Sequence, residues 1–418
     1  MAFLGMRGTG DWVANQRPEN WREMVLYLYP NGQAPLTAML AKMGSEATND
    51  PIFHWWQKAL PDQRAAITGV YTDSGLTTAY VSGGAAGDTL YVKMSAADVA
   101  KFKAGHQILL RVATALVTDV NAKVTAATAN GASSYLTVKL LEADDNGAGV
   151  SKDLSDATDV LVIGTIHPEG DTAPSSLMYD PTEYSNYTQI FRTALEHTRT
   201  AMKTKLRTGD AVKQAKKEAL ELHSVEMEKA FIFGVKSSGT GSNGKPERTS
   251  GGIKSFLSSN VSDYTKQTGT ATWLAAGEEW LDSMFEQIFR YGTGEKIAFC
   301  GSGALLGINR LAKQNGTFEL TAKTKSYGVQ VLEWLTPFGT VHLKTHPLFS
   351  FNATMRNSML ICEPSNFKYR YVDDTKYKPS IQANDLDGEK SEYLTEAGLE
   401  VHFEQSMGWL DGVGQDNP

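Results

Sequence analysis

Between residues 62 and 170, glycines divide the sequence into short runs in which apolar and polar residues alternate. Examples are Thr89–Met94, Gln107–Val112, Ser134–Leu140 and Val160–Gly164. Because successive side chains of a strand point to opposite faces of a sheet, this alternation indicates half-buried strands. Strands that recur roughly every ten residues are typical of a small antiparallel barrel or sandwich. The stretch therefore predicts a β-rich module that differs from the rest of the chain.

The other broad features exclude several protein classes. With 418 residues the chain is longer than a typical domain, which predicts two or three folded units. No apolar run approaches the ~18 residues of a membrane span, and no signal-peptide core precedes Asp11. Two cysteines, Cys300 and Cys362, cannot form a disulfide framework. We therefore expect neither a secreted, disulfide-stapled protein nor a membrane protein, and the cysteine usage suits a reducing cytosol.

The sequence predicts a long helical region over residues 182–234. Apolar side chains recur there at steps of three and four, and Thr208–Asp210 breaks or kinks the pattern. The second part alone would extend ~35 Å at 1.5 Å per residue. Its basic residues lie near the N-terminal end and its acidic residues near the C-terminal end, which suits a long, rigid structural helix.

Several shorter elements are also predicted. A helix over Ala34–Met43 precedes Gly44, and an α/β unit follows the long helix. The helices of that unit are expected at Thr272–Tyr291 and Ala304–Lys313, and its strands at Lys296–Cys300, Val329–Leu335 and Thr340–Leu343. From residue 358 onward the pattern returns to strands, at Ser358–Cys362, Phe367–Val372 and Glu392–Met407.

Charge is unevenly distributed along the chain. The net charge is −7, but residues 381–418 hold nine acids and one base, so the remaining residues net +1. Residues 192–217 hold eight bases and two acids. Opposite blocks attract between molecules, so this polarity favours self-association, although solvated faces that happen to cluster explain it equally well. The candidate interface residues in these blocks are Lys213, Lys216, Lys217, Glu396 and Glu400.

The first 60 residues mix tryptophans with turn residues. The tryptophans are Trp12, Trp21, Trp55 and Trp56. Exposed tryptophans on a loosely structured arm need a surface to pack against. We therefore expect these four residues to contact a neighbouring surface.

One glycine-rich segment resembles a phosphate-binding loop. Gly239–Lys245 matches G-x-x-x-x-G-K, in which glycine N–H groups and the lysine would hold phosphates. The Ser or Thr that would hold magnesium is replaced by Pro246, and a predicted helix, not a strand, precedes the loop. A mobile linker is the favoured interpretation, and nucleotide binding stays open as an alternative.

The remaining motifs indicate no catalytic, cofactor or metal site. Gly301–Gly307 reads as a strand–helix turn, because no acidic residue ends a following strand as a dinucleotide site requires. His342 and His346 are four apart, but in a strand and turn that spacing makes no helical metal pair. The alternation of aromatic and basic residues over Phe367–Tyr371 fits a nucleic-acid-stacking strand or an aromatic core face equally well.

The order of these parts resembles the major capsid proteins of tailed bacteriophages, which have the Hong Kong 97-type fold. Ala194–Gly234 looks like the spine helix of that family, and Gly251–Leu257 like the passage to its axial domain. Glu295–Leu305 and Tyr327–Leu332 resemble axial-domain strands and turns. Gly388–Val401 is similar to the closing β segment of the peripheral domain. The likeness covers most of residues 180–418.

This resemblance implies an α+β protein divided into five parts. They are an N-terminal arm (1–60), an extended loop with a β-rich insertion (61–180), a peripheral-domain spine helix (181–236), an axial domain (237–358) and a closing peripheral β segment (359–418). The subgroup that it looks most like carries a β-rich insertion in its extended loop. The arm and the loop would lap over neighbouring subunits, and the 192–217 bases would meet the 381–418 acids of an adjacent subunit.

The function that the resemblance implies is that of a non-enzymatic capsid subunit in the virion, assembled in the host cytoplasm. Its partners would be copies of itself in hexamers and pentamers, a portal protein, a separate scaffold protein, a decoration protein and double-stranded DNA, with no membrane. Two alternatives remain open: an encapsulin-like cellular shell protein, and a nucleotide-dependent α/β enzyme that uses the loop at 239–245.

Overall fold

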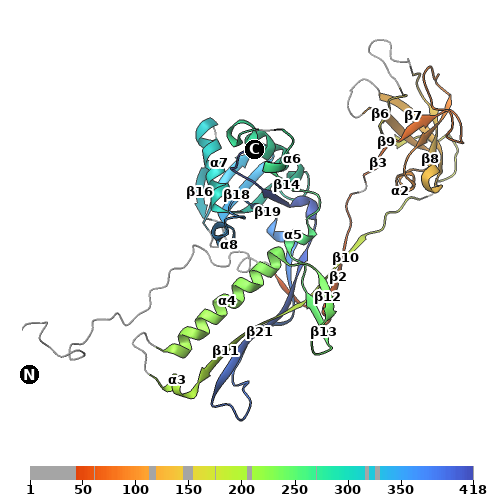
Figure 1. Cartoon of the computed structure of the whole chain (residues 1–418). Helices are drawn as coiled ribbons and strands as arrows, with labels where there is room; N and C mark the ends of the chain where they lie inside the picture. Colours follow the sequence, from red (N-terminus) through yellow and green to blue (C-terminus); the bar gives the residue numbers. More distant parts are fainter. Residues whose placement is uncertain are drawn as a thin grey trace, which may run out of the picture. The chain divides into compact units, whose positions relative to one another are not determined.

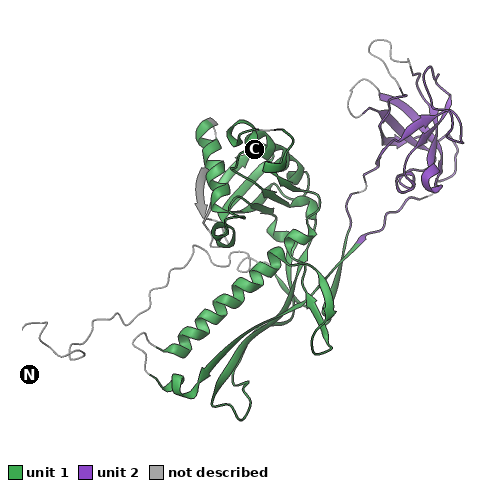
Figure 2. Ribbon diagram, in the orientation of Figure 1, with its two compact units in different colours: residues 1–57, 183–418 green, residues 58–182 purple. Residues whose placement is uncertain are grey.

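The computed structural model describes residues 44–60, 62–112, 119–144, 154–174, 176–204, 210–269, 271–315, 320–324 and 330–417. The chain divides into two compact units (Figures 1 and 2). One is Lys58–Thr182, here called the β unit. The other, here called the main unit, combines Met1–Gln57 with Glu183–Pro418.

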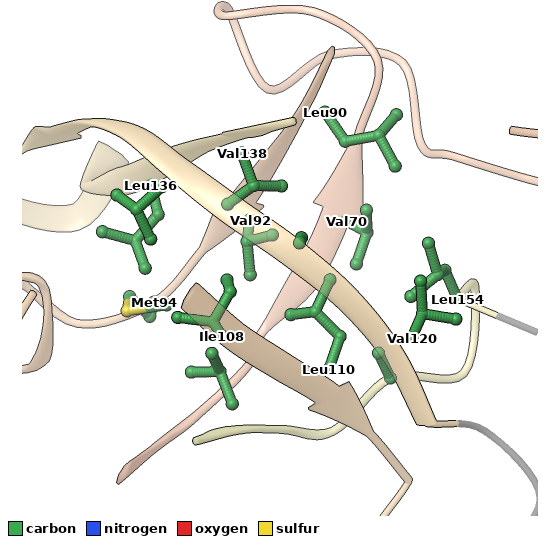
Figure 3. Close-up of a cluster of buried hydrophobic side chains, with 14 of the residues drawn as sticks. Val70, Leu90, Val92, Met94, Ile108, Leu110, Val120, Leu136, Val138 and Leu154 are labelled. Atoms are coloured by element: carbon green, nitrogen blue, oxygen red, sulfur yellow. The ribbon is translucent and has the colours of Figure 1, made fainter. Parts of the chain in front are cut away.

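The β unit is a seven-stranded sheet in the order β3-β9-β6-β7-β8-β5-β4. All its neighbouring strands run antiparallel. The strands are β3 (Arg64–Ala66), β4 (Gly69–Tyr71), β5 (Thr89–Lys93), β6 (His106–Arg111), β7 (Asp119–Thr128), β8 (Tyr135–Leu140) and β9 (Asp159–Thr165), with a short helix α2 (Ala96–Val99). Alternate side chains such as Val92, Ile108, Val120 and Val138 are fully buried in one core (Figure 3). The antiparallel strands predicted from the alternating runs are therefore confirmed.

A long helix packed on a four-stranded sheet forms one half of the main unit. The sheet has the order β1-β20-β21-β11. Its strands are β1 (Ser45–Ala47), β11 (Gln189–Thr198), β20 (Phe367–Lys378) and β21 (Gly388–Val401). Helix α4 (Ala211–Phe233) begins at Asp210, whose side chain accepts hydrogen bonds from the N–H groups of Val212 and Lys213. A carboxylate at this position satisfies N–H groups that have no partner within the helix.

The helix predicted at the start of residues 182–234 is wrong over residues 182–198. Residues 182–187 form β10, residues 189–198 form β11, and only Arg199–Lys203 is a helix, α3. The two buried anchors of β11, Phe191 and Leu195, are four residues apart. That spacing places two side chains on one face of a helix and also on one face of a strand, so it does not separate the two structures. Strand β10 pairs with β2 (Ile52–Gln57) as a two-stranded ribbon.

A seven-stranded sheet forms the other half of the main unit, in the order β14-β22-β19-β15-β18-β17-β16. The strands are β14 (Val261–Asp263), β15 (Glu295–Cys300), β16 (Leu320–Thr324), β17 (Gln330–Thr336), β18 (Gly339–Thr345), β19 (Met359–Cys362) and β22 (Gly408–Asp411). The helices of this half are α5 (Ile253–Phe256), α6 (Trp273–Phe289), α7 (Ser302–Asn315) and α8 (Pro347–Phe351). The predicted helices at 272–291 and 304–313 and the predicted strand at 296–300 are confirmed, and β17 and β18 confirm the strands predicted near 329–335 and 340–343 for the residues that the structure describes.

This sheet is buried on both faces. On β15, Phe299 packs with α4 residues such as Phe231, and with Trp409 of β22, in one hydrophobic core. The flanking Ala298 and Cys300 point into a second core with residues of α6 and α7. Sheets covered on both faces have continuous apolar strands, as at Met359–Cys362, where all four residues are buried.

The α+β fold class that the capsid resemblance implies is confirmed by this mixture of helices and mainly antiparallel sheets. Two other expectations have different outcomes. The helix predicted at 34–43 lies outside the described residues, as do Trp12 and Trp21. The mobile linker predicted at 239–245 is wrong, because β12 (Ser237–Thr240) and β13 (Pro246–Thr249) form a hairpin around it.

Candidate assembly surfaces

The tryptophan pair of β2 is divided between the core and the surface. Trp55 is 5 % exposed, and its ring lies 6.1 Å from the ring of Tyr184 and 5.9 Å from that of Phe256. Trp56 is 62 % exposed. Strand alternation accounts for the division, because neighbouring side chains point to opposite faces. The expectation of an exposed side chain is therefore wrong for Trp55, which packs in the core of its own subunit. Of these two residues, only Trp56 has an exposed side chain.

The opposite charge blocks meet within one chain. Strand β11 pairs antiparallel with β21, which brings Arg192 to 2.5 Å from Glu392, and Arg199 beyond its end to 2.7 Å from Asp387. Arg192 and Arg199 therefore have acidic partners in their own chain, and contact of this segment with acids of another subunit stays a prediction. Arg199 and Asp387 form an exposed ion pair, and such pairs typically contribute below ~1 kcal/mol to stability. Glu392 is 5 % exposed, so its pair with Arg192 is partly buried.

The three lysines of α4 occupy different environments. Lys213 is 86 % exposed in its side chain and lies 3.9 Å from Asp210, and Lys217 lies 3.8 Å from Glu221. Lys216 instead points back to the sheet, with its ammonium 4.6 Å from the centre of the Tyr377 ring. A hydrogen bond to Tyr377 raises the pKa of Lys216. Lys213 and Lys217 are therefore the members of this set whose charge is directed to solvent.

The two predicted glutamates also differ. Glu400 is 2 % exposed and lies 2.5 Å from both Arg370 Nε and His402 Nε2. Burial alone would raise the pKa of Glu400, but the hydrogen bonds from His402 and Arg370 outweigh it and hold that pKa below its usual value. Glu396 is half-buried and accepts a hydrogen bond from Thr188 at 3.1 Å. Glu400 is therefore an internal ion-pair residue, and its expected place at an interface is wrong within this geometry.

The G-x-x-x-x-G-K segment is the turn of the β12–β13 hairpin. The Gly241 N–H donates to the Lys245 carbonyl at 2.8 Å, and the Gly244 N–H donates to the Gly241 carbonyl at 2.9 Å. These N–H groups are the ones that a phosphate would need, and the turn itself uses them. Strand β13 begins at Pro246, so no helix N-terminus follows the glycines. The geometry gives the nucleotide-binding alternative no support.

An apolar groove lies between α4 and α8. It has a volume of about 670 Å³ and is lined mainly by apolar side chains, including Val225, Phe233, Leu348 and Phe351. Beside it, the fully buried Glu228 of α4 lies 2.7 Å from His346 Nε2. No sequence pattern joins Glu228 to His346, because the two residues are 118 positions apart and each by itself resembles a surface residue.

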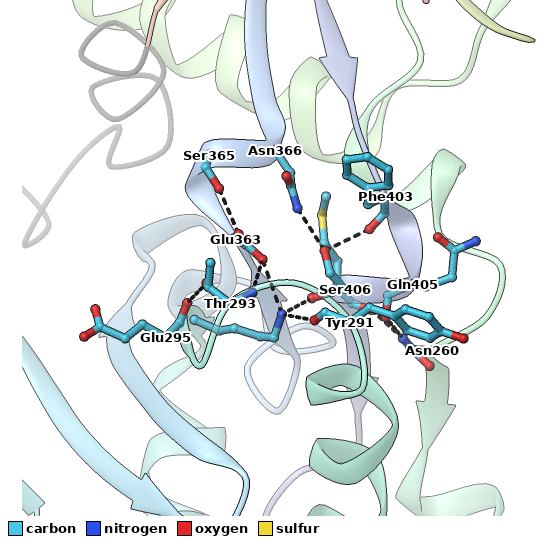
Figure 4. Close-up of polar contacts among 12 residues, drawn as sticks. Asn260, Tyr291, Thr293, Glu295, Glu363, Ser365, Asn366, Phe403, Gln405 and Ser406 are labelled. Carbon is cyan, nitrogen blue, oxygen red and sulfur yellow. Dashed lines mark hydrogen bonds and ion pairs between the residues drawn. The ribbon is translucent and has the colours of Figure 1, made fainter. Parts of the chain in front are cut away.

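A buried lysine lies near the start of β15. Lys296 is fully buried; its ammonium donates to the carbonyls of Ser406 at 2.9 Å and Tyr291 at 3.1 Å, and it lies 3.5 Å from Glu363. Figure 4 shows Glu363, Tyr291 and Ser406 converging from different segments. Burial lowers the pKa of Lys296, and the charge of Glu363 opposes that shift. Every proton of this ammonium has an acceptor nearby, so the cluster fastens three segments together.

The remaining motif residues are structural. Cys300 and Cys362 are buried free thiols, and Tyr369, at the centre of the aromatic–basic alternation, belongs to the core beside α4. Among the described residues, His, Cys, Asp and Glu side chains nowhere gather in a group of three or more that could hold a metal ion. The described helices include none with the length and apolar content needed to cross a bilayer.

Comparison with known proteins gives a family for the chain. The family model of the SU10 major capsid protein matches residues 7–414. The "Major capsid protein" of Pseudomonas phage PaMx41 is 24% identical over 360 residues, which cover 85% of this chain and 78% of that protein.

Solved structures with a similar fold come from capsids and related shells. The capsid of a native GTA particle aligns over 96% of this chain and 97% of its own, with a TM-score of 0.47 and 8% identity. The structure from Mycobacterium phage Adephagia aligns over 95% of this chain and 92% of its own, with a TM-score of 0.41 and 9% identity. The holo-SrpI encapsulin complex from Synechococcus elongatus PCC 7942 aligns over 56% of this chain and 77% of its own, with a TM-score of 0.40 and 12% identity.

The match to the family model spans nearly the whole chain and includes both structural units. It confirms the resemblance to phage major capsid proteins that the order of the elements indicates. The chain belongs to the SU10 major capsid protein family.

Proposed function

We propose that this major capsid protein assembles into hexamers and pentamers, which together form an icosahedral phage head around double-stranded DNA. The observation that carries the proposal is the family match over residues 7–414. A structural, non-enzymatic role follows from that family. Its place is the virion, and assembly in the host cytoplasm is part of the proposal.

The five parts of the chain would have separate roles in such a shell. The arm (1–60) and the extended loop (61–180) would lap over neighbours. The peripheral parts (181–236 and 359–418) would make contacts at local two- and three-fold positions through α4 and the strands β11, β20 and β21, whereas β19 and β22 of the last part pair within the seven-stranded sheet. The axial domain (237–358) would surround the capsomer centre. The separate hydrophobic core of residues 58–182 supports the part of this proposal that treats the β unit as an inserted module.

The proposed interface residues are now fewer. Trp56, Lys213 and Lys217 present their side chains to solvent and are available to another subunit. Trp12, Trp21 and Glu396 stay candidates, although the two tryptophans lie outside the described residues. Modest contacts of this kind suffice in a closed shell, because each subunit makes many of them at once. Further partners would be a portal protein, a separate scaffold protein and a decoration protein.

Expression alone and together with neighbouring phage genes tests the proposal. Negative-stain electron microscopy and sedimentation velocity should detect shells, rings or sheets with hexamer dimensions. A well-behaved monomer under both conditions would contradict the proposed function. Cargo protein inside shells, encoded beside the capsid gene, would instead favour the encapsulin-like alternative.

A charge-reversal variant tests the lysine surface within the same experiment. Lys213→Glu with Lys217→Glu should weaken particle formation, because both ammonium groups are directed to solvent. Lys139→Glu with Lys313→Glu, at exposed positions of β8 and α7, is the control that makes the same change in net charge. Equal particle yields from all three proteins would remove Lys213 and Lys217 from the interface.

A further inference from the structure

The four-stranded sheet of the main unit has one long and regular edge, which is strand β11. Every residue of β11 pairs with β21 in one continuous register. Among the strands that the structure describes, none pairs with the other side of β11. An uncovered edge carries a row of backbone N–H and C=O groups that can pair with a further strand. The sheet is therefore open to extension along β11.

The opposite edge of the same sheet is protected. Strand β1 covers only Tyr369–Tyr371 of β20. Beyond these residues, the pairing of β20 with β21 shifts register twice, between Tyr371 and Asp373 and between Asp373 and Lys376. Such bulges bend an edge strand and hinder regular pairing with another chain. Strand β11 has no bulge in its pairing with β21 and no proline, so its edge lacks these protections.

Helix α4 covers one face of the sheet and leaves the β11 edge accessible. His223 of α4 forms hydrogen bonds with Thr193 of β11 at 3.0 Å and with Thr395 of β21 at 2.7 Å. Lys216 reaches further inward, to the ring of Tyr377 on β20. Figure 1 shows α4 running along β11 and β21. Because these contacts hold α4 over β11 and its inner neighbours, a further strand can approach β11 in the plane of the sheet.

The face of β11 away from α4 carries charges that are complementary to those of a second copy. Arg192 and Glu196 are exposed on this face, with the exposed Ala194 between them. Within the chain, Arg192 lies 2.5 Å from Glu392, and Glu196 pairs with Lys390. If two copies of β11 run antiparallel with Ala194 opposite Ala194, each Arg192 lies opposite the Glu196 of the other copy. Acidic and basic side chains then alternate across four strands.

The same charges disfavour the neighbouring registers. With Arg192 opposite itself, two guanidinium groups would face each other, and with Glu196 opposite itself, two carboxylates would do so. Like charges directly opposite each other destabilise a strand pair. In the registers centred on Thr193 or Leu195, Arg192 and Glu196 are not directly opposite. The charge pattern therefore selects the register centred on Ala194.

We propose that β11 pairs antiparallel with β11 of a second copy of this chain, about a two-fold axis at Ala194 and over at least Arg192–Glu196. The two four-stranded sheets then become one continuous sheet. Such a contact is isologous, because both subunits use the same surface. Main-chain hydrogen bonds supply its strength, and the charge pattern supplies its register. The inference rests on the proposed capsid function and names the strand that makes a local two-fold contact.

Cysteine crosslinking in the full chain tests this pairing. Directly opposite residues of an antiparallel pair have Cα atoms about 4.5–5.5 Å apart, which a disulfide spans. Ala194→Cys should therefore give disulfide-linked dimers on oxidation with copper–phenanthroline in air. In this register Thr198 lies roughly 27 Å from its copy, so Thr198→Cys is the matched control and should give at least about tenfold fewer dimers. The native Cys300 and Cys362 are buried and should add little background.

The absence of dimers from Ala194→Cys, or equal dimer yields from the two cysteine variants, would overturn the pairing. Particle formation is scored separately. Shells of Ala194→Cys without the disulfide refute only this contact, and disulfide-linked dimers that never assemble refute only the capsid function.

A charge on the axis gives an independent measurement. Ala194→Lys would bring two ammonium groups together and should lower the particle yield at least about tenfold. Ser283→Lys, at an exposed position of α6, adds the same charge elsewhere and should leave the yield unchanged. Equal particle yields from these two variants would also overturn the pairing.

Discussion

Removal of the buried charge at Lys296 should destabilise the main unit strongly. Lys296→Met leaves the carboxylate of Glu363, itself 5 % exposed, without its cation. It also removes the donor to the carbonyls of Tyr291 and Ser406. Loss of one member of a buried ion pair costs about 3–5 kcal/mol, which is a large part of the 5–15 kcal/mol that stabilises a typical domain.

The double variant Lys296→Met/Glu363→Gln should recover much of this loss. The glutamine still accepts from the Thr293 N–H, which lies 3.1 Å from Glu363 Oε2, and buries no charge. We expect the double variant to cost about 1–2 kcal/mol, since a buried pair contributes little net stability compared with neutral groups. The two substitutions should therefore be coupled by about 2 kcal/mol or more.

Tryptophan fluorescence during urea unfolding measures these values selectively. All eight tryptophans lie outside residues 58–182, so the signal follows the main unit alone. Lys313→Met, at an exposed position of α7, is the matched control and should change the unfolding free energy by less than about 0.5 kcal/mol. A loss below about 1 kcal/mol for Lys296→Met, or a double variant equal to the sum of its singles, would refute the reasoning.

Three further outcomes follow from other parts of the structure. Burial raises the pKa of the Cys362 thiol to about 12 from an ordinary value of 9.0. Because the folded state keeps a proton that the unfolded chain releases, the unfolding free energy should fall as pH rises from about 9 to 12. This fall should be less steep in the Cys362→Ala variant. Gly307→Ala would place a Cβ 2.3 Å from the Cα of Gly414 and should lower the fluorescence-detected melting temperature, whereas Gly239→Ala, with open space around it, should not. Residues 58–182 expressed alone should give a dispersed NMR spectrum and a cooperative melt by circular dichroism, because their core is self-contained; a spectrum typical of an unfolded chain would contradict this.

The sequence predicted correctly those helices and strands whose spacing of apolar residues fits only one kind of secondary structure. Helix α6 buries Leu281, Phe285 and Ile288, which are spaced by four and then by three residues, and the step of three does not fit a strand. Strands β6 and β8 of the β unit alternate between buried and more exposed residues along their whole length, and that pattern fits no helix. These elements could be located from the sequence because one structure alone satisfies their pattern.

The sequence misled where one pattern fits two structures. The spacing of Phe191 and Leu195 is compatible with both a helix and a strand. The segment forms a strand because β21 pairs with every residue of β11. That partner lies about two hundred residues further along the chain, as the pair Arg192 and Glu392 shows. Tertiary pairing of this range overrides local propensity and leaves no local trace.

The buried polar sites escaped prediction for a related reason. Lys296, Glu228 and His346 are single residues in segments of ordinary composition. Each is fully buried only because several segments converge on it. The tryptophans show the opposite error: Trp55 and Trp56 are adjacent and identical in type, and strand direction alone sends one to the core and the other to solvent.

The three hydrophobic cores determine which substitutions should affect one another. The two faces of β15 belong to different cores, so a change at Phe299 perturbs α4 while a change at Ala298 or Cys300 perturbs α6 and α7. Both act on one strand, and their effects should therefore be coupled. The core of the β unit shares no residue with either, so its substitutions should add independently to those of the main unit. Substitutions in residues 58–182 should therefore leave the stability of the sheets that carry α4, α6 and α7 unchanged. Because of this independence, a capsid protein can vary one part of its chain without unfolding the rest.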